Sequence, residues 1–414
     1  MYNNENIKIE IASQKCLSIL LKGDFFIGES QRRISGVWNI SICDNKIYFE
    51  DEIEVIVFDQ DVFFNPLNKV TCSCTLLIDQ KNHFGFNKGN SFRGGIIVHQ
   101  DEEALSLVNQ VDVEGFVSSV ICNSYPGITD LEYLKTQAVI VRNSSILLSK
   151  DDSFKYVESQ YFEDSIYCKE LNFAPSNLLV KYRGESIKCN DIAHQAVKET
   201  EGLALSFQDE ITVIPGSLCC GGVTHNYSES VIGIVDGVPN PLNLHDNKIF
   251  ERWMDGKGRK YNCTECDDNI THTLLVYSDL DENEVAKWNK TISIELLEIV
   301  LSEYTVLGII IDFEVRERAE SGIVTKLEVI GQGGTMVFEK EQLNWFLGAL
   351  QLPSKSFVVQ KNKVEKSGFS FKGVGTGSNA GVCHLGALSL SRNGKTMEEI
   401  LAHYLPKFVL EKQY

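Results

Sequence analysis

Short runs in which apolar and polar residues alternate dominate the first 110 residues. Examples are IKIEIA, CLSILLKG, WNISICDN and KIYFEDE, and pairs such as Gly23-Asp24 and Asp44-Asn45 separate them. Alternation with a period of two places successive side chains on opposite faces of a strand, and such pairs favour turns. The pattern therefore predicts a β-rich N-terminal region over residues 1–110, and we find no catalytic chemistry in it.

A different pattern follows in TDLEYLKTQAVIVRNSSILL, residues 129–148. Apolar residues at helical spacing cover most of the circumference, which is typical of a helix buried inside a large domain. Thr129 is expected to cap the N-terminus, with Glu132 as its reciprocal partner. Lys135 and Arg142 are basic exceptions, and a buried basic side chain needs a partner or a route to water. From residue type alone, we favour structural pairing for both.

The spacing of apolar residues predicts further helices and strands after residue 190. DIAHQAVKETEGLALSF predicts a helix followed by a strand, and ELLEIVLSEYTVLG predicts a helix before the strands IIIDFEVRER, VTKLEVIG and TMVFEK. Three helices are predicted near the C-terminus: one in EQLNWFLGAL, one that starts with GVCHLGA, and one in MEEILAHYL. SFVVQK predicts a strand. The chain is therefore predicted to be α+β, with a mixed α/β core after its β-rich N-terminal region.

Charge and hydropathy narrow the class of function. The chain has 414 residues and a formal net charge of -18. Binding to a nucleic-acid backbone needs clustered Lys and Arg, so nucleic acid is disfavoured as a partner, as are anionic membrane surfaces. No window approaches the roughly 18 apolar residues of a membrane helix, so no integral membrane segment is expected. The N-terminus shows no readable secretion signal, and the compartment stays open.

The twelve cysteines follow no compact secreted disulfide framework. Cys16, Cys43, Cys122 and Cys189 lie in apolar or alternating runs, and we interpret them as buried thiols.

A structural zinc ion is the one cofactor that the cysteine spacing raises. Cys263 and Cys266 form a C-x-x-C pair, and Cys219 with Cys220 could complete a four-thiolate site. Because neighbouring side chains diverge, only one of the adjacent pair is expected to bind. Two histidines, His225 and His272, are alternative ligands. Free or packed thiols remain the favoured interpretation.

Two glycine-containing loops, in SLCCGGVTHNYSES and GVGTGSNAGVCHLGA, are the least regular parts of the chain. Paired glycines allow a close approach of the backbone, so the loops could line a groove for a polymer or could simply be tight turns. The second loop is not followed by Lys-Ser or Lys-Thr, so a nucleotide phosphate loop is not supported.

Three motifs in order resemble the sporulation stage II protein D (SpoIID) and LytB amidase-enhancer family. They are LEYLKTQAVIVRNSSILL, then SLCCGGVT, then GVGTGSNAGVCHLGA followed by EEILAHYLP. FRGGIIV resembles the N-terminal part of longer members. The resemblance implies a core with a groove over residues 111–414, carrying a variable insertion at about 231–340. It also implies binding to peptidoglycan glycan strands in the cell envelope, cleavage of those strands by lytic transglycosylation, or stimulation of a cell-wall hydrolase of the amidase type.

The resemblance also assigns residues to a site. The family's catalytic glutamate, which protonates the glycosidic oxygen and then acts as a base, falls on Ser124. Where the family usually has a histidine, this chain has Ser378 and Asn379. The residues expected to contact substrate are Lys135, Arg142, Ser217, Cys220, Gly221, Gly222, Gly377, Ser378 and His384.

These differences from the family's residues leave three alternative functions. A serine cannot act as a general acid near neutral pH, so a glycan-binding member with weakened or absent catalysis is favoured. An active lytic transglycosylase would need a displaced carboxylate, and Glu114, Asp130 and Glu132 are the candidates. The third alternative is an amidase-enhancer-like or intracellular binding protein.

Overall fold

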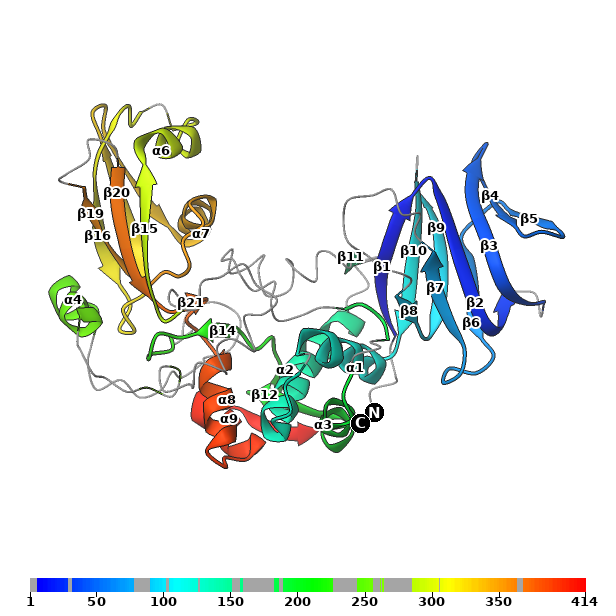
Figure 1. Cartoon of the computed structure of the whole chain (residues 1–414). Helices are drawn as coiled ribbons and strands as arrows, with labels where there is room; N and C mark the ends of the chain where they lie inside the picture. Colours follow the sequence, from blue (N-terminus) through cyan, green and yellow to red (C-terminus); the bar gives the residue numbers. More distant parts are fainter. Residues whose placement is uncertain are drawn as a thin grey trace.

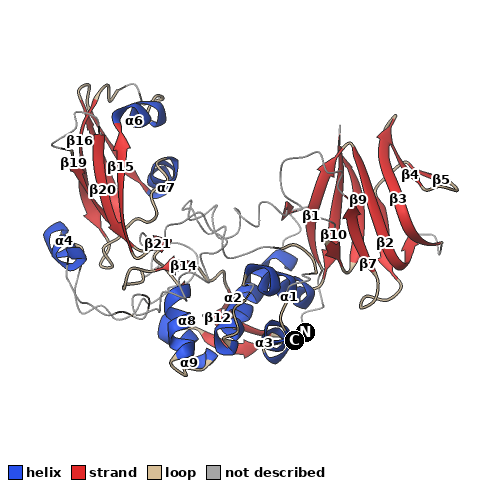
Figure 2. Ribbon diagram, in the orientation of Figure 1, coloured by secondary structure: helices blue, strands red, loops and turns tan. Residues whose placement is uncertain are grey.

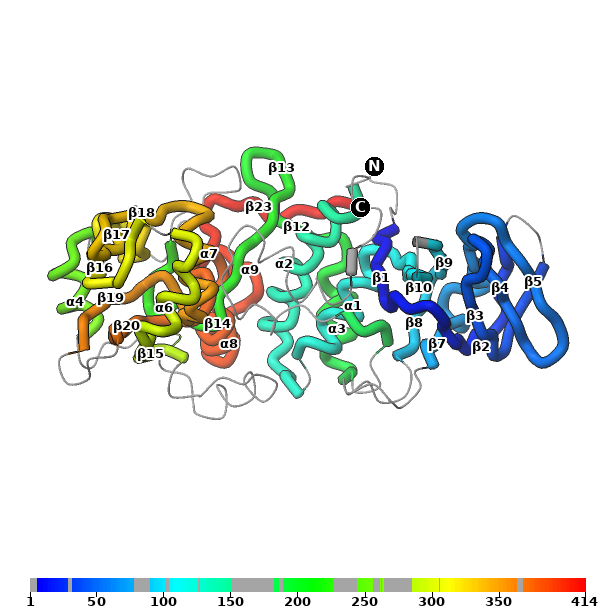
Figure 3. Tube along the Cα trace, turned by 90° about the horizontal axis from the view of Figure 1, so that it is seen from above, coloured from blue at the N-terminus to red at the C-terminus, as the bar shows by residue number. Residues whose placement is uncertain are grey.

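The computed structural model describes residues 6–28, 32–77, 90–101, 104–125, 127–150, 157–158, 182–185, 189–225, 244–255, 261, 263, 285–304, 306–362 and 368–414. The fold is α+β with a β-rich N-terminal region, as predicted. In Figure 1 the N-terminal sheet, a group of helices and a second sheet follow one another across the molecule. The view from above in Figure 3 shows the same linear order.

The N-terminal region forms one large antiparallel sheet whose strands show the alternating burial that the sequence predicts. Strand β2 (Cys16–Ile27) lies near its middle, and buried apolar side chains such as Leu17, Ile19 and Leu21 alternate along it with less buried ones. The other strands are β1 (Ile7–Gln14), β3 (Arg33–Cys43), β4 (Lys46–Glu50), β5 (Val55–Phe58), β6 (Val62–Pro66), β7 (Ser73–Leu77), β8 (Ser91–Phe92), β9 (Gly95–Asp101) and β10 (Ala104–Val111), with β11 (Val157–Glu158) parallel to β1.

The helices next to this sheet surround α2 (Leu131–Lys150), the helix that the sequence predicts over residues 129–148. Helix α2 contacts α1 (Val113–Ser124), α3 (Asp191–Glu199), α8 (His384–Arg392) and α9 (Met397–Tyr404). Its buried residues lie around most of its circumference, as its apolar pattern predicts. Figure 2 shows these helices grouped below and between the two sheets.

Helix α1 is the main element that the sequence patterns did not predict. It begins after Asp112, whose carboxylate accepts a hydrogen bond from the N–H of Gly115 at 2.7 Å. Its apolar residues Val113, Phe116, Val117, Val120 and Ile121 recur at helical spacing and are buried, but its opening residues continue the alternating pattern of the strand before it. Helix α1 nevertheless ends at Ser124, the position that the family resemblance singles out.

A second β-rich part, made of two three-stranded sheets and called the second sheet for short, has a hydrophobic core of its own. Strands β15 (Lys287–Ser293), β20 (Gly368–Val374) and β19 (Phe357–Lys361) form one antiparallel sheet, and β16 (Ile310–Arg318), β17 (Val324–Gly331) and β18 (Thr335–Glu339) form another. Helices α6 (Ile294–Val300) and α7 (Lys340–Ala349) pack with them, and α4 (Asn247–Asp255) lies beside them. The core cluster runs from Trp288 to Phe371, separate from the cluster around α2.

Short strands join the two glycine-containing loops to the α2 region. Strand β14 (Gly216–Cys219) pairs with β21 (Thr376–Gly377) and β22 (Val382–Cys383). Strand β12 (Leu203–Phe207) pairs with β13 (Glu210–Ile211) and with β23 (Val409–Lys412) near the C-terminus. In the part of the chain that the structure describes, no helix is both long and apolar enough to cross a membrane.

The structure corrects the prediction of four buried thiols. Cys16 and Cys43 are exposed near the ends of strands, where a side chain no longer faces the covered side of the sheet. Cys122 and Cys189 form a disulfide, although they are 67 residues apart in sequence. Burial of Cys122 was therefore predicted correctly, but its chemistry was not.

Candidate functional site

The two glycine-containing loops form a single unit around β14. Ser217 pairs with Gly377 across one edge of this strand and with Cys383 across the other. The hydroxyl oxygens of Ser217 and Ser378 lie 3.2 Å apart, and Ser378 also donates to the carbonyl of Gly216 at 2.9 Å. Both serines are buried. The structure thus joins residues that are about 160 positions apart in sequence.

The glycines of this unit serve close packing of the two loops. A Cβ on Gly221 would come within 2.8 Å of the Gly375 nitrogen, and one on Gly375 would come within 2.8 Å of the Cys219 carbonyl. Both residues have a positive φ, at 70° and 75°, which a larger residue adopts only with strain. The ring of Tyr261 covers Gly222. Of the two roles open for these loops, tight packing is the one that these contacts explain.

His384 sits at the start of α8 inside an aromatic cluster. Its Nδ1 shares a hydrogen bond of 2.9 Å with the hydroxyl of Tyr133, and its ring stacks on Tyr125 with centroids 6.2 Å apart. Burial lowers the pKa of His384 to about 4, so the ring is neutral near pH 7. Because Tyr125 directly follows Ser124, these contacts place the end of α1 beside the C-terminal loop.

Two amide side chains of the motifs keep unused hydrogen-bonding capacity. Gln137 on α2 is 1% exposed, and its Oε1 accepts from the hydroxyl of Tyr125 at 3.3 Å. Its Nε2 has no partner within the described residues, and the same holds for Oδ1 of Asn379, which is also 1% exposed. Most buried polar atoms in proteins are paired, so each exception calls for an explanation such as water or a ligand.

Ser124 ends α1 and is partly exposed. The last turn of this helix carries no basic residue, so the partial negative charge of the helix C-terminus is not offset there. A hydroxyl at this position can accept or donate a hydrogen bond to a sugar, but it cannot donate a proton in acid catalysis.

Arg142 takes part in a closed buried network, away from the two loops. Its side chain is 0% exposed and binds both carboxylate oxygens of Glu114, at 2.7 and 2.8 Å. It also donates to the carbonyl of Leu203 at 3.1 Å, while Glu114 accepts from the Tyr414 hydroxyl and the Gly202 N–H. Burial alone would raise the pKa of Glu114, but the contacts with Arg142 outweigh it and hold that pKa below its usual value.

The other charged candidates also form ion pairs, near the start of α2. Lys135 lies 2.8 Å from Glu132 and 2.6 Å from Glu199, in ion pairs on the partly exposed side of α2. Asp130 pairs with Arg392 at 3.2 Å. Neither Lys135 nor Arg142 is brought into contact with the two loops by any of these interactions. The geometry supports the structural pairing that their residue type indicates.

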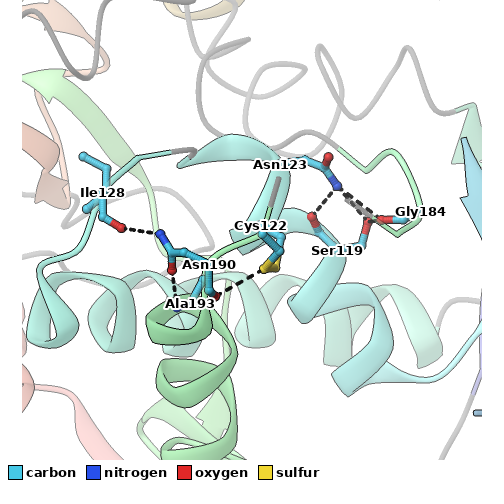
Figure 4. Close-up of a disulfide and its surroundings, with 8 residues drawn as sticks. Ser119, Cys122, Asn123, Ile128, Gly184, Asn190 and Ala193 are labelled. Carbon is cyan, nitrogen blue, oxygen red and sulfur yellow. Dashed lines mark hydrogen bonds between the residues drawn. A yellow bond between two sulfur atoms is a disulfide. The ribbon is translucent and has the colours of Figure 1, made fainter. Parts of the chain in front are cut away.

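The disulfide Cys122–Cys189 fixes the region just before Ser124. Figure 4 shows it linking α1 to the residue before the N-cap of α3. That cap, Asn190, accepts from the N–H of Ala193 at 2.7 Å and donates to the carbonyl of Ile128 at 3.0 Å. The segment between α1 and α2 is therefore tied to α3 on both sides of Ser124.

Thiols from three segments meet beside β14. The Sγ atoms of Cys220, Cys263 and Cys383 all lie within 4.8 Å of one another, and Cys219 interacts with Cys263 and Cys383. These residues include three of the four cysteines that the sequence proposes as zinc ligands, and the fourth, Cys266, lies outside the described residues. Cys383 is the member that sequence spacing missed, because it lies 120 residues after Cys263.

Sequence reasoning also missed Tyr125, Tyr133 and Gln137. Tyr133 and Gln137 are four residues apart, so they lie on one face of α2, and this spacing was the available signal. Nothing in the local sequence, however, indicates that this face meets the start of α8.

Two family models match the chain. Residues 101–207, which include α1, α2, α3 and β12, match the family described as stage II sporulation protein. Residues 221–381, which include the second sheet, match the family described as a domain of unknown function (DUF8618). No curated protein matches the chain. The part of the chain that holds α1, α2 and α3 is thus similar to the stage II sporulation protein family.

Proposed function

We propose that this protein binds glycan strands of peptidoglycan without cleaving them. The observation that carries the proposal is the pair of buried amides, Gln137 and Asn379, with an unpartnered polar atom on each of two different motifs. An unpaired buried polar atom costs about 1–3 kcal/mol, so its persistence is explained if a hydroxyl-rich ligand or bound water pairs with it. Glycan hydroxyls can both donate and accept, which suits an amide nitrogen and an amide oxygen.

The absence of cleavage is supported by the ion pairs of the three carboxylates that are candidates to replace the family's glutamate. Glu114 is held ionised by Arg142, Asp130 pairs with Arg392, and Glu132 pairs with Lys135. A general acid must carry a proton near the working pH, which requires a raised pKa. The pKa of Glu114 is instead lowered.

The Cys122–Cys189 disulfide supports a location in the cell envelope. Disulfides persist in oxidising compartments and are rare in a reducing cytosol. The disulfide therefore favours the glycan-binding proposal over an intracellular binding protein.

Sedimentation with insoluble peptidoglycan tests binding. The parent is expected in the pellet, and Gln137→Leu is expected to stay largely in the supernatant. Its free energy of unfolding should fall by only about 1 kcal/mol, because Oε1 loses one long hydrogen bond from the Tyr125 hydroxyl and Nε2 has no partner to lose. Gln195→Leu is the matched control, since Gln195 is exposed on α3 and its amide donates to Glu199. A parent that stays wholly in the supernatant contradicts the proposal.

Ser124→Glu tests the missing acid. The uncompensated C-terminus of α1 should raise the pKa of a carboxyl placed there, which favours its protonated form. We expect the parent to release no soluble anhydro-muropeptides from purified peptidoglycan, and the variant to release them. Release by the parent would refute the non-cleaving role.

A further inference from the structure

Four buried thiols converge from segments that are distant in sequence. Cys219 and Cys220 end β14, Cys383 precedes α8, and Cys263 lies in the segment between them. All four are at most 5% exposed. Burial of a single thiol does not require such convergence, which brings four thiols from three segments together.

The sulfur positions match those of a metal-thiolate site. The Sγ atoms of Cys220 and Cys263 are 3.7 Å apart. A disulfide requires about 2.05 Å, so these atoms are not bonded to each other. Four sulfurs around zinc at about 2.3 Å in a tetrahedron lie about 3.8 Å apart. The observed separation therefore corresponds to one edge of such a tetrahedron.

Backbone N–H groups point at these sulfurs. The N–H of Cys220 donates to Sγ of Cys383 at 3.3 Å, and the N–H of Gly386 donates to the same atom at 3.4 Å. The N–H of Gly221 donates to Sγ of Cys219 at 3.4 Å. Donors of this kind stabilise negative charge on sulfur and orient metal ligands from outside the coordination shell.

We propose that Cys220, Cys263 and Cys383, whose Sγ atoms all lie within 4.8 Å of one another, bind one Zn²⁺ ion in a structural site beside β14. Thiols still protonated release their protons to solvent when the ion binds, and no redox step is involved. The ion would join the segment that carries Cys263 to both glycine-containing loops. This site is independent of the glycan-binding proposal, because neither Gln137 nor Asn379 contributes a ligand.

Metal content of the full-length chain tests the site. Protein purified under reducing conditions without added metal is expected to hold about one zinc per chain by plasma mass spectrometry. Cys263→Ser and Cys383→Ser should each lower this at least several-fold. Cys74→Ala controls for loss of a buried thiol, and Cys189→Ser controls for the group of Cys122, Cys189 and His194, whose ligand atoms also lie close together. Both control variants should keep the zinc.

Two further measurements do not depend on the variants folding. Replacing zinc by Co²⁺ in the parent should produce the visible absorption of a tetrahedral thiolate site. Chelator should lower the unfolding midpoint of the parent and expose Cys263 and Cys383 to alkylation, as read by peptide mass spectrometry. A parent that binds neither zinc nor Co²⁺, a Cys220–Cys263 disulfide in reduced preparations, or iron with sulfide in place of zinc would each overturn the proposal.

Discussion

Arg142 and Gln137 lie five residues apart on the same buried helix, and their surroundings are opposite in kind. Arg142 is fully buried and binds Glu114 through two hydrogen bonds, with further bonds to backbone carbonyls. Gln137 is almost as deeply buried, yet its Nε2 has no partner in the described part of the chain. The hydrogen bonds of Arg142 are therefore supplied within the protein, whereas Gln137 keeps one donor group that no described residue uses.

We therefore assign Arg142 to the stability of the fold and Gln137 to recognition of a ligand. A buried charge without a partner costs several kcal/mol, so the chain must satisfy Arg142 internally. A buried amide atom without a partner costs less and can be left for a ligand. Basic residues in a motif are thus not by themselves evidence of a substrate contact, even when family resemblance suggests one.

The largest effect is expected from Arg142→Met. Removing the guanidinium leaves Glu114 mostly buried without its charge partner, and breaking such a pair costs about 3–5 kcal/mol. Urea unfolding of the parent and the variant measures the loss. A loss below about 1 kcal/mol would show that the network is not structural, and the contrast with Gln137 would fail.

Acidification should destabilise the protein partly through His384. Its pKa is about 4 in the folded state, below its ordinary 6.5, so the unfolded chain binds the proton first. Stability is therefore complete above pH 6.5 and is lost as pH falls from 6.5 toward 4, by up to about 1.4 kcal/mol per pH unit.

His384→Gln isolates this contribution in urea unfolding at pH 7, 6 and 5. The variant should lose less stability on acidification than the parent. The slope that remains includes His225, whose pKa burial likewise lowers to about 4. Equal slopes in parent and variant would contradict the assignment.

A smaller effect is expected from Tyr133→Phe. The change removes the hydroxyl that pairs with Nδ1 of His384 and leaves that buried nitrogen without this partner, at a cost of about 1–2 kcal/mol. Chemical unfolding measures it, and Tyr48→Phe on the partly exposed side of β4 provides a control. A neutral result would mean that the aromatic contacts alone position His384.

The smallest effect is expected from Lys135→Met. Its ion pairs with Glu132 and Glu199 lie at a partly exposed position, where such pairs contribute little. The unfolding midpoint should shift by no more than about 2 °C, and sedimentation with peptidoglycan should not change. Loss of sedimentation with intact stability would instead make Lys135 a glycan contact, as the family resemblance implies.

Sequence periodicity predicted the strands and helices that bury one face, and the long helix that is buried on most of its surface. The strands of the N-terminal sheet, helix α2 within two residues at each end, and helices α8 and α9 all follow from it. Helix α1 was missed because its first residues, in VDVEGFV, continue the alternating pattern of the preceding strands and were assigned to them. The helix predicted in ELLEIVLSEYTVLG ends early, at Val300.

The site was harder to predict than the fold because its contacts are long-range. The motifs indicated Ser217, Ser378 and His384 individually, but not that β14 would join them. The pairing of Glu114 with Arg142, the disulfide partner of Cys122 and the approach of Cys383 to Cys220 are set by tertiary packing. Local sequence carries no distance information across such separations.

The pairing of β14 with β21 also bears on how this gene could have been assembled. The chain leaves the α2 region at Gly221 and returns at Gly375, and these two glycines are in backbone contact. A segment whose ends meet can be acquired, exchanged or lost without moving the residues on either side. The segment between these glycines makes up most of residues 221–381, which the second family model matches, so a unit recognised by sequence is also one whose two ends meet in the fold.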